Sequence, residues 1–152
     1  MQLTSTSFLD GEPMPVAHSR DGEGSLPVLV LTDVPEGVQS FAVPAHDPDV
    51  PRDPRPDGNF DHCLVWNLPA DTHEIASPTD HQGVVGLNTL GAHEWVPASP
   101  PPGSGAHRYI FTAYALDAEL DLPAASTRAE LEAAMAHHVL ASAQMMGTYE
   151  RP

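Results

Sequence analysis

The sequence predicts a mostly β fold in a single domain spanning residues 1–152. Three observations support this prediction. A chain of 152 residues suits one compact domain, its apolar segments are short, and 17 prolines and 11 glycines separate them. Strands need only about five or six residues each, whereas helices need longer periodic stretches. We therefore expect a β-rich domain with long ordered connections.

Several short segments have the composition of strands. Pro44 interrupts one of them and indicates an edge strand or a bulge. Residues 70–105 form a long irregular region rich in Pro, His and Gly, and connections of this length are usually functional. The last two of the predicted strands are apolar on both faces, which indicates burial within a sheet. The predicted strands are 3–8, 26–31, 40–46, 63–68 and 108–116.

One helix is predicted near the C-terminus. Thr127 and Glu130 match a capping box in which Thr127 is the N-cap. Apolar residues recur at helical spacing from Leu131 to Met146. Gly147 is a natural residue to follow the end of a helix. The pattern therefore predicts a helix that runs from Thr127 to Gly147.

The charge of the chain excludes several classes of partner. It carries 21 acidic residues and only six basic ones, all arginine, for a formal net charge of −15. Such a surface repels nucleic acid and anionic membranes, and no segment has the apolar length of a membrane span. The first residues lack the features of a signal peptide, so a cytoplasmic location is expected. A salt-adapted host and a codon bias both remain explanations for the acidity.

Carboxylates and histidines lie at the ends of the predicted strands. Asp47 and Asp49 are two residues apart, and in an extended chain both would point into one small polar pocket. His62 and His107 each lie at the edge of another strand. In the alternative interpretation, the aspartates only mark turns and the histidines are structural. Arg108 is then expected to form an ion pair with a buried carboxylate.

The sequence predicts neither a metal centre nor a cofactor. The histidines lack chelating spacings, and His137 and His138 would point about 100° apart on a helix. Ser104 lies between two glycines, but the lysine and helix of a phosphate-binding loop are missing, as is the pattern of a nucleophile elbow. Cys63 is the one cysteine, which excludes an internal disulfide, and its place within a strand predicts a buried, inert thiol.

Taken together, these segments resemble the phosphatidylethanolamine-binding protein family, also called Raf kinase inhibitor-like proteins, and most closely its prokaryotic branch. The resemblance covers residues 25–151. It rests most on two motifs and their separation, Asp-Pro-Asp-x-Pro at residues 47–51 and His-Arg-Tyr at residues 107–109. In order, the matching segments are 34–37, 40–43, 47–51, 60–62, 64–69, 86–88, 100–101, 107–109, 114–117 and 147–150.

The resemblance implies an antiparallel β-sandwich with a few peripheral helices and an anion pocket at one end of the sheet. That pocket accepts phosphate, acetate or the phosphoryl head of phosphoethanolamine. Pro97 stands where the family usually has glycine, which removes a backbone donor from the loop. By the resemblance, the pocket walls are Asp47, Asp49, His62, His107 and Tyr109. Its shape would depend on Pro51, Pro100, Pro101 and Tyr149, with Val50–Pro51 a candidate cis peptide.

These features predict a non-enzymatic protein that binds a small anion, a phosphorylated headgroup or a phosphorylated side chain. By resemblance, family members modulate kinases or proteases, and no sequence feature identifies a target. One alternative is a hydrolase or lyase in which Asp47, His62 and His107 serve as acid and base. Another is an interaction module with a vestigial pocket, which Pro97 favours. The prokaryotic branch also suggests a homodimer.

Overall fold

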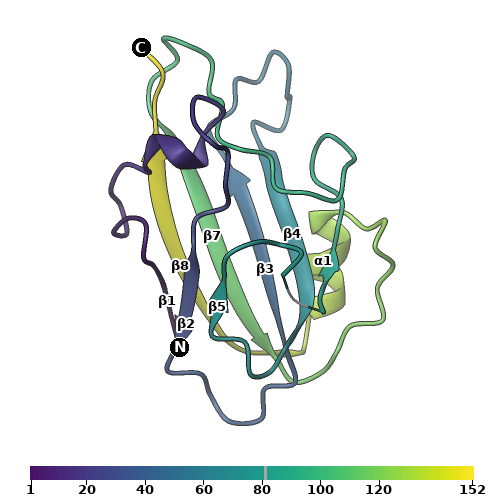
Figure 1. Ribbon diagram of the computed structural model, residues 1–152. Coiled ribbons are helices and arrows are strands. Elements are labelled where there is room, and N and C mark those ends of the chain that lie inside the picture. The colour runs from purple at the N-terminus through teal and green to yellow at the C-terminus, as the bar shows by residue number, and fades with distance from the viewer. Residues whose placement is uncertain (81) are drawn as a thin grey trace.

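Two antiparallel sheets lie face to face in the computed structural model, which describes residues 1–80 and 82–152 (Figure 1). The mostly β prediction is confirmed. The smaller sheet has the order β1-β2-β5 and comprises β1 (Gln2–Ser5), β2 (Leu29–Thr32) and β5 (Glu74–Ile75). The larger has the order β6-β4-β3-β7-β8 and comprises β3 (Ser40–Asp47), β4 (Phe60–Pro69), β6 (Val84–Val85), β7 (His107–Leu116) and β8 (Val139–Tyr149). The helices are the 3-10 turn η1 (Val16–His18) and α1 (Arg128–Met135).

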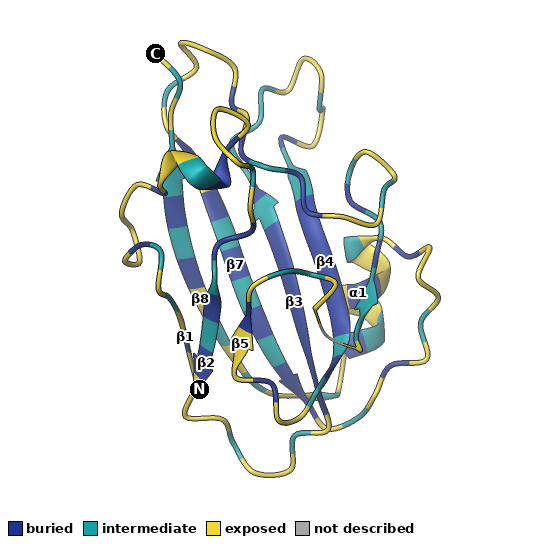
Figure 2. Cartoon of the chain, viewed as in Figure 1, coloured by how far each residue is buried: buried dark blue, intermediate teal, exposed yellow. Residues whose placement is uncertain are grey.

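The central strands β3 and β4 of the larger sheet are buried on both faces, and Figure 2 shows them dark blue over most of their length. One face packs on the smaller sheet, where Phe41 and Phe111 join Leu29 and Ile75 in the main core. The opposite face packs on α1 in a second cluster, formed by Ala42, Leu64, Trp66, Leu116, Leu120, Leu131 and Met135. Burial on both sides explains why the central strands read as apolar throughout.

Pro44 lies in a central strand, because β3 pairs with β4 on one side and with β7 on the other. The edge-strand interpretation of Pro44 is therefore wrong. The bulge interpretation is confirmed, since the β3–β4 register shifts between Phe41 and Val43 and again between Ala45 and His46. The two shifts lie on either side of Pro44, which has no backbone N–H to donate to the neighbouring strand.

The helix near the C-terminus is confirmed, but it ends at Met135 instead of continuing to Gly147. Its predicted cap is present, because the Thr127 hydroxyl accepts a hydrogen bond from the Glu130 N–H. His137 then adopts a left-handed φ of 70°, and the chain continues as β8, paired with β7. Pairing along the whole of β8 outweighs the helical spacing of its apolar residues. No helix of the described residues is long and apolar enough to cross a membrane.

The predicted cis bond at Val50–Pro51 is wrong, because residues 1–80 and 82–152 contain no cis peptide bond. The turn after β3 is built instead by a side chain. Asp47 Oδ1 accepts a hydrogen bond of 2.7 Å from the Asp49 N–H, as in an Asx turn. A trans bond, which X–Pro sequences favour by about 0.5–1 kcal/mol, is compatible with this turn.

Candidate functional site

A cavity of about 310 Å³ opens at one end of the larger sheet. Because β3 runs antiparallel to β4 and β7, the end of β3 meets the beginnings of the other two strands there. Four residues from these ends, which we call the floor, line the cavity and are buried: Asp47, His62, His107 and Tyr109. The structure thus brings together four of the five residues that the resemblance assigned to the pocket walls.

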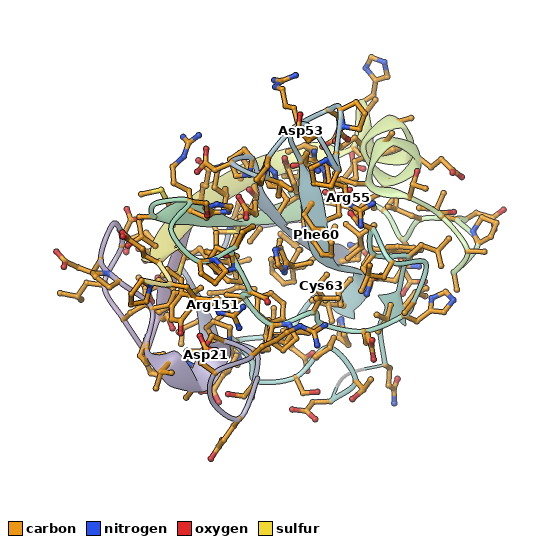
Figure 3. All side chains as sticks on the ribbon, turned by 90° about the horizontal axis from the view of Figure 1, so that it is seen from above. Asp21, Asp53, Arg55, Phe60, Cys63 and Arg151 are labelled. Atoms are coloured by element: carbon orange, nitrogen blue, oxygen red, sulfur yellow. The ribbon has the colours of Figure 1, made fainter. Side chains whose placement is uncertain are left out.

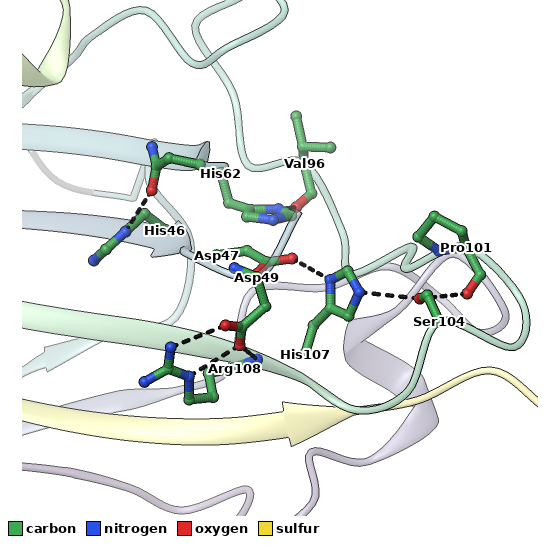
Figure 4. A network of polar contacts seen from close by, with 10 residues as sticks. His46, Asp47, Asp49, His62, Val96, Pro101, Ser104, His107 and Arg108 are labelled. Atoms are coloured by element: carbon green, nitrogen blue, oxygen red, sulfur yellow. Dashed lines mark hydrogen bonds and ion pairs between the residues drawn. The ribbon is translucent and has the colours of Figure 1, made fainter. Parts of the chain in front are cut away.

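His107 and Asp47 form a buried pair in the floor. His107 Nδ1 lies 2.8 Å from Asp47 Oδ2, within hydrogen-bond distance. On the other side of the ring, His107 Nε2 lies 3.0 Å from Ser104 Oγ. The Ser104 hydroxyl in turn donates to the Pro101 carbonyl at 2.7 Å. Figure 4 shows this chain of contacts running from the floor to the loop before β7.

Ser104, His107 and Asp47 are connected in the order of a serine–histidine–aspartate triad. Ser104 nevertheless lies outside the cavity lining, and its hydroxyl is engaged by the Pro101 carbonyl. The link to His107 was not predicted from the sequence. The two glycines around Ser104 are its only local signal, since both have positive φ (76° at 103 and 86° at 105) and let the loop turn back on β7.

His62 is held by the loop that follows β6. Its Nδ1 lies 2.6 Å from the carbonyl oxygen of Val96, and the Val96 N–H donates to the His62 carbonyl at 2.9 Å. Three aromatic rings surround the imidazole, with centroids at 4.7 Å for Phe60, 5.2 Å for Tyr109 and 5.5 Å for Trp95. Burial lowers the pKa of His62 below its usual value of 6.5, so the ring is neutral at neutral pH.

Two polar atoms of the floor have no hydrogen-bond partner among the described residues, His62 Nε2 and the Tyr109 hydroxyl. In the described part of the chain, three side-chain polar atoms are fully buried and have no hydrogen-bond partner. They belong to Trp66, Thr72 and Trp95. The two floor atoms are not among them, so both keep some accessible surface, and both residues line the cavity. Burial raises the pKa of Tyr109, which therefore remains a neutral phenol. Both atoms are free to bind a ligand.

Asp49 is not brought into the cavity. Its two carboxylate oxygens accept hydrogen bonds of 2.9 Å from Nε and Nη2 of Arg108, and one also accepts the Arg108 N–H (Figure 4). These bonds lower the pKa of Asp49. Asp49 lies beyond the end of β3, so strand alternation no longer aligns it with Asp47. Within residues 1–80 and 82–152, no three His, Cys, Asp or Glu side chains gather in a metal-binding arrangement.

Tyr149 also lies outside the cavity lining, in a cluster that connects the C-terminus to the loop after η1. Its hydroxyl donates to Asp21 Oδ2 at 2.7 Å, and the Arg151 guanidinium binds both carboxylate oxygens of Asp21 at 2.9 Å. Figure 3 shows Asp21 and Arg151 side by side. The neighbouring Arg20 donates its N–H to the Ala98 carbonyl at 2.9 Å. The cluster therefore positions Arg20 beside the cavity.

Arg20 and Arg55 line the cavity and were not predicted as site residues. We call them the rim arginines, because both are less buried than the floor. Neither forms an ion pair with another described residue, and Arg55 Cζ lies 5.3 Å from the centroid of the Phe60 ring (Figure 3). No sequence motif links positions this far apart, and only the fold places them together. The proline residues of the mouth are Pro51, Pro54, Pro97, Pro100 and Pro101.

Cys63 takes no part in the cavity. It is buried in β4, and burial raises the pKa of its thiol to about 12. The predicted burial of Cys63 is confirmed, and the raised pKa disfavours the reactive thiolate at neutral pH.

Comparison with known proteins agrees with the motifs. The family described as phosphatidylethanolamine-binding protein matches residues 4–150. A UPF0098 protein of Chlamydia muridarum is 41% identical over 151 residues, which are 99% of each chain. A UPF0098 protein of Aquifex aeolicus is 35% identical over 157 residues, and the match covers 99% of this chain and 89% of the Aquifex protein.

Solved structures give the same result. A putative phosphatidylethanolamine-binding protein homologue from Chlamydia trachomatis superposes with a TM-score of 0.94 at 40% identity, covering 99% of this chain and 97% of its own. Escherichia coli YbcL, a member of the same family, has a TM-score of 0.87 at 28% identity and covers 99% and 98%. This chain therefore belongs to the phosphatidylethanolamine-binding protein family.

Proposed function

We propose that this protein binds a small phosphate-bearing anion in the cavity and does not transform it. One observation carries the proposal: the cavity of about 310 Å³ receives two partner-free polar atoms, on His62 and Tyr109. Its volume lies at the lower end of the range for small-molecule sites, which suits a phosphoryl headgroup. Family membership supports a binding-protein fold. Phosphate, phosphoethanolamine and a phosphorylated side chain share the chemistry required.

The rim arginines supply the positive charge of the site. His62 is neutral at neutral pH, and Asp47 pairs with His107, so the floor offers hydrogen bonds rather than a strong positive field. A guanidinium group forms bidentate hydrogen bonds with a phosphate, and two of them lie beside this cavity. They act against the net charge of −15. At about 0.15 M ionic strength the screening length is about 8 Å. Carboxylates farther from the cavity than this therefore repel a bound anion only weakly, whereas the arginines in contact with it keep their attraction.

Binding of a phosphorylated side chain would let the protein modulate a kinase or a protease. A cytoplasmic location and a homodimer also stay predictions. Leu90, 55% exposed at the cavity, offers an apolar contact beside the phosphoryl group. Comparing phosphoserine with O-phosphoethanolamine separates this ligand class from a headgroup.

Replacing both rim arginines by glutamine is expected to weaken phosphate binding at least about tenfold, because each charge-assisted hydrogen bond contributes about 1.5–3 kcal/mol. Arg52→Gln is the matched control. It removes one charge from the loop that carries Arg55, but Arg52 lies outside the cavity lining and donates to the Pro56 carbonyl. NMR titrations with phosphate, O-phosphoethanolamine and phosphoserine at about 0.15 M ionic strength measure the affinities.

Two results would contradict this proposal in different ways. Absence of saturable shifts in the wild-type protein would favour an interaction module with a vestigial pocket. Unchanged affinity in the Arg20→Gln/Arg55→Gln variant would leave an anion site but remove the rim arginines from it.

The order Ser104–His107–Asp47 favours hydrolysis as a second candidate function, with Ser104 as nucleophile and His107 as base. We expect no covalent labelling by a fluorophosphonate, because the Ser104 hydroxyl binds the Pro101 carbonyl and lies outside the cavity lining. Mass spectrometry of the treated protein, with Ser104→Ala as control, measures this. An adduct on Ser104 that requires the folded protein would establish the hydrolase instead.

A further inference from the structure

His62 presents a hydrogen-bond acceptor to the cavity. Its Nδ1 lies 2.6 Å from the Val96 carbonyl oxygen, which cannot donate, so the proton of this bond is on Nδ1. In a neutral ring, Nε2 then carries a lone pair and no proton. The bond of 2.9 Å from the Val96 N–H to the His62 carbonyl holds the two residues together. Turning the ring to exchange its nitrogens would break the Nδ1 bond.

The surroundings of His62 favour the neutral ring. The imidazole is enclosed by aromatic side chains, which solvate a cation poorly compared with water. Asp47 and Asp61 favour protonation and His46 opposes it, but burial has the largest effect and lowers the pKa of His62. The acceptor at Nε2 is therefore the form that a ligand meets at neutral pH.

Tyr109 completes the requirement on the ligand. Its phenol hydroxyl can donate or accept, and its ring centroid lies 5.2 Å from that of His62. A ligand oxygen between the two side chains can accept from Tyr109, but it must donate to His62 Nε2. An O–H group satisfies both contacts. A bare anionic oxygen satisfies Tyr109 and places its negative charge against the imidazole lone pair.

We propose that this site selects anions that carry a hydrogen-bond donor, and that His62 is the residue that determines this specificity. The inference rests on the proposed anion-binding function and names its ligand class. Hydrogen phosphate and phosphomonoesters in their monoprotonated form have the required P–O–H group. Sulfate and simple phosphodiesters lack it. A phospholipid headgroup, which is a diester, can meet the requirement only through another donor such as its ammonium group.

We expect a large difference in affinity between ligands that differ only in the P–O–H hydrogen. A binding site that leaves a buried acceptor unpaired rejects the analogue without the donor much more strongly than an apolar site rejects a change of size. We expect methyl phosphate to bind at least about tenfold more tightly than dimethyl phosphate or sulfate.

The experiment compares these three probes by NMR titration of the wild-type protein at about pH 6, near the second pKa of a phosphomonoester. About half of the methyl phosphate is then a monoanion with one P–O–H, and dimethyl phosphate is a monoanion without one. Glycerophosphoethanolamine is a fourth probe, a diester with an ammonium group. If the site rejects dimethyl phosphate but binds glycerophosphoethanolamine, the inference is supported and the ligand can be a lipid headgroup. If the site rejects both diesters, the inference is supported and the ligand is a free monoester.

Two further measurements test the role of His62 directly. In His62→Gln the side-chain amide can both donate and accept, so the preference for methyl phosphate should fall to about threefold or less. His46→Gln is the control, since His46 lies outside the cavity lining, bonds to Asn59, and should leave the preference unchanged. The nitrogen NMR spectrum of the wild-type His62 ring should show a protonated Nδ1 and an unprotonated Nε2.

The outcomes separate the two levels of the proposal. Equal affinities for methyl and dimethyl phosphate, or a protonated Nε2 in a neutral His62 ring, would overturn the donor requirement and leave the proposed function intact. Failure of every probe to bind would overturn the proposed function and this inference with it. If His62→Gln does not fold, the wild-type ligand comparison and the ring spectrum still decide.

Discussion

Replacing Asp47 by alanine is expected to lower the free energy of unfolding by about 2–5 kcal/mol, because each buried donor left without its acceptor costs about 1–3 kcal/mol. Asp47 is 3% exposed, and its two carboxylate oxygens accept hydrogen bonds from the His107 ring and the Asp49 N–H. Alanine would leave both donors without an acceptor, and it would release the ring that forms one wall of the cavity. Urea unfolding of the two proteins measures the difference.

Asp49→Ala is the matched control, because it removes the same side chain two residues further along. In the Asp49–Arg108 ion pair the aspartate side chain is 29% exposed and the arginine 51%. Exposed pairs contribute only about 0–1 kcal/mol, so the expected loss is about 1 kcal/mol or less. Equal losses in the two variants would show that burial does not distinguish these aspartates. Asp47→Asn should fall between them, since an amide oxygen can still accept the Asp49 N–H.

Replacing Phe111 by alanine is expected to lower the free energy of unfolding by about 3–5 kcal/mol, the usual result of removing a buried aromatic ring. Phe111 is fully buried in β7, with its ring centroid 6.0 Å from Trp95 and 6.4 Å from Phe8. Trp95 also packs on His62, so the cavity left by alanine would loosen the support of the floor. We therefore expect weaker phosphate binding in the same variant, measured in the same titrations.

Thr112→Ala provides the control on the neighbouring position of β7. Thr112 points to the opposite face, is only partly buried, and accepts a hydrogen bond of 3.3 Å from Gln144. Substitutions of this kind usually change stability by about 0.5 kcal/mol or less. A loss below about 2 kcal/mol in Phe111→Ala would mean that the core beneath the cavity relaxes around the missing ring.

Local patterns in the sequence predicted those elements whose cause is local. The apolar runs of β3, β4 and β7 identified the central strands. The capping box at Thr127 identified where α1 begins. These predictions succeed because a strand end, a cap or a buried face depends on residues within a few positions of one another.

Elements that depend on distant partners were not predicted correctly. The spacing from Leu131 to Met146 suits a helix, yet pairing with β7 makes its second half a strand. Asp49 shares the motif of Asp47, yet Arg108, 59 residues away in sequence, holds it outside the cavity. In both cases a contact made by the folded chain outweighs a local preference.

The sequence by itself determined the β class of the protein, its strongly negative charge, the start of its helix and the residue types of the floor. Only the tertiary structure decided how the side chains of the floor are held. The bond from His62 to Val96 spans 34 residues and sets which ring nitrogen faces the cavity, and the bond from His107 to Asp47 spans 60. The rim arginines come from two separate loops. Contacts of this kind depend on how loops close over the sheet, and the local pattern of a sequence does not encode that closure.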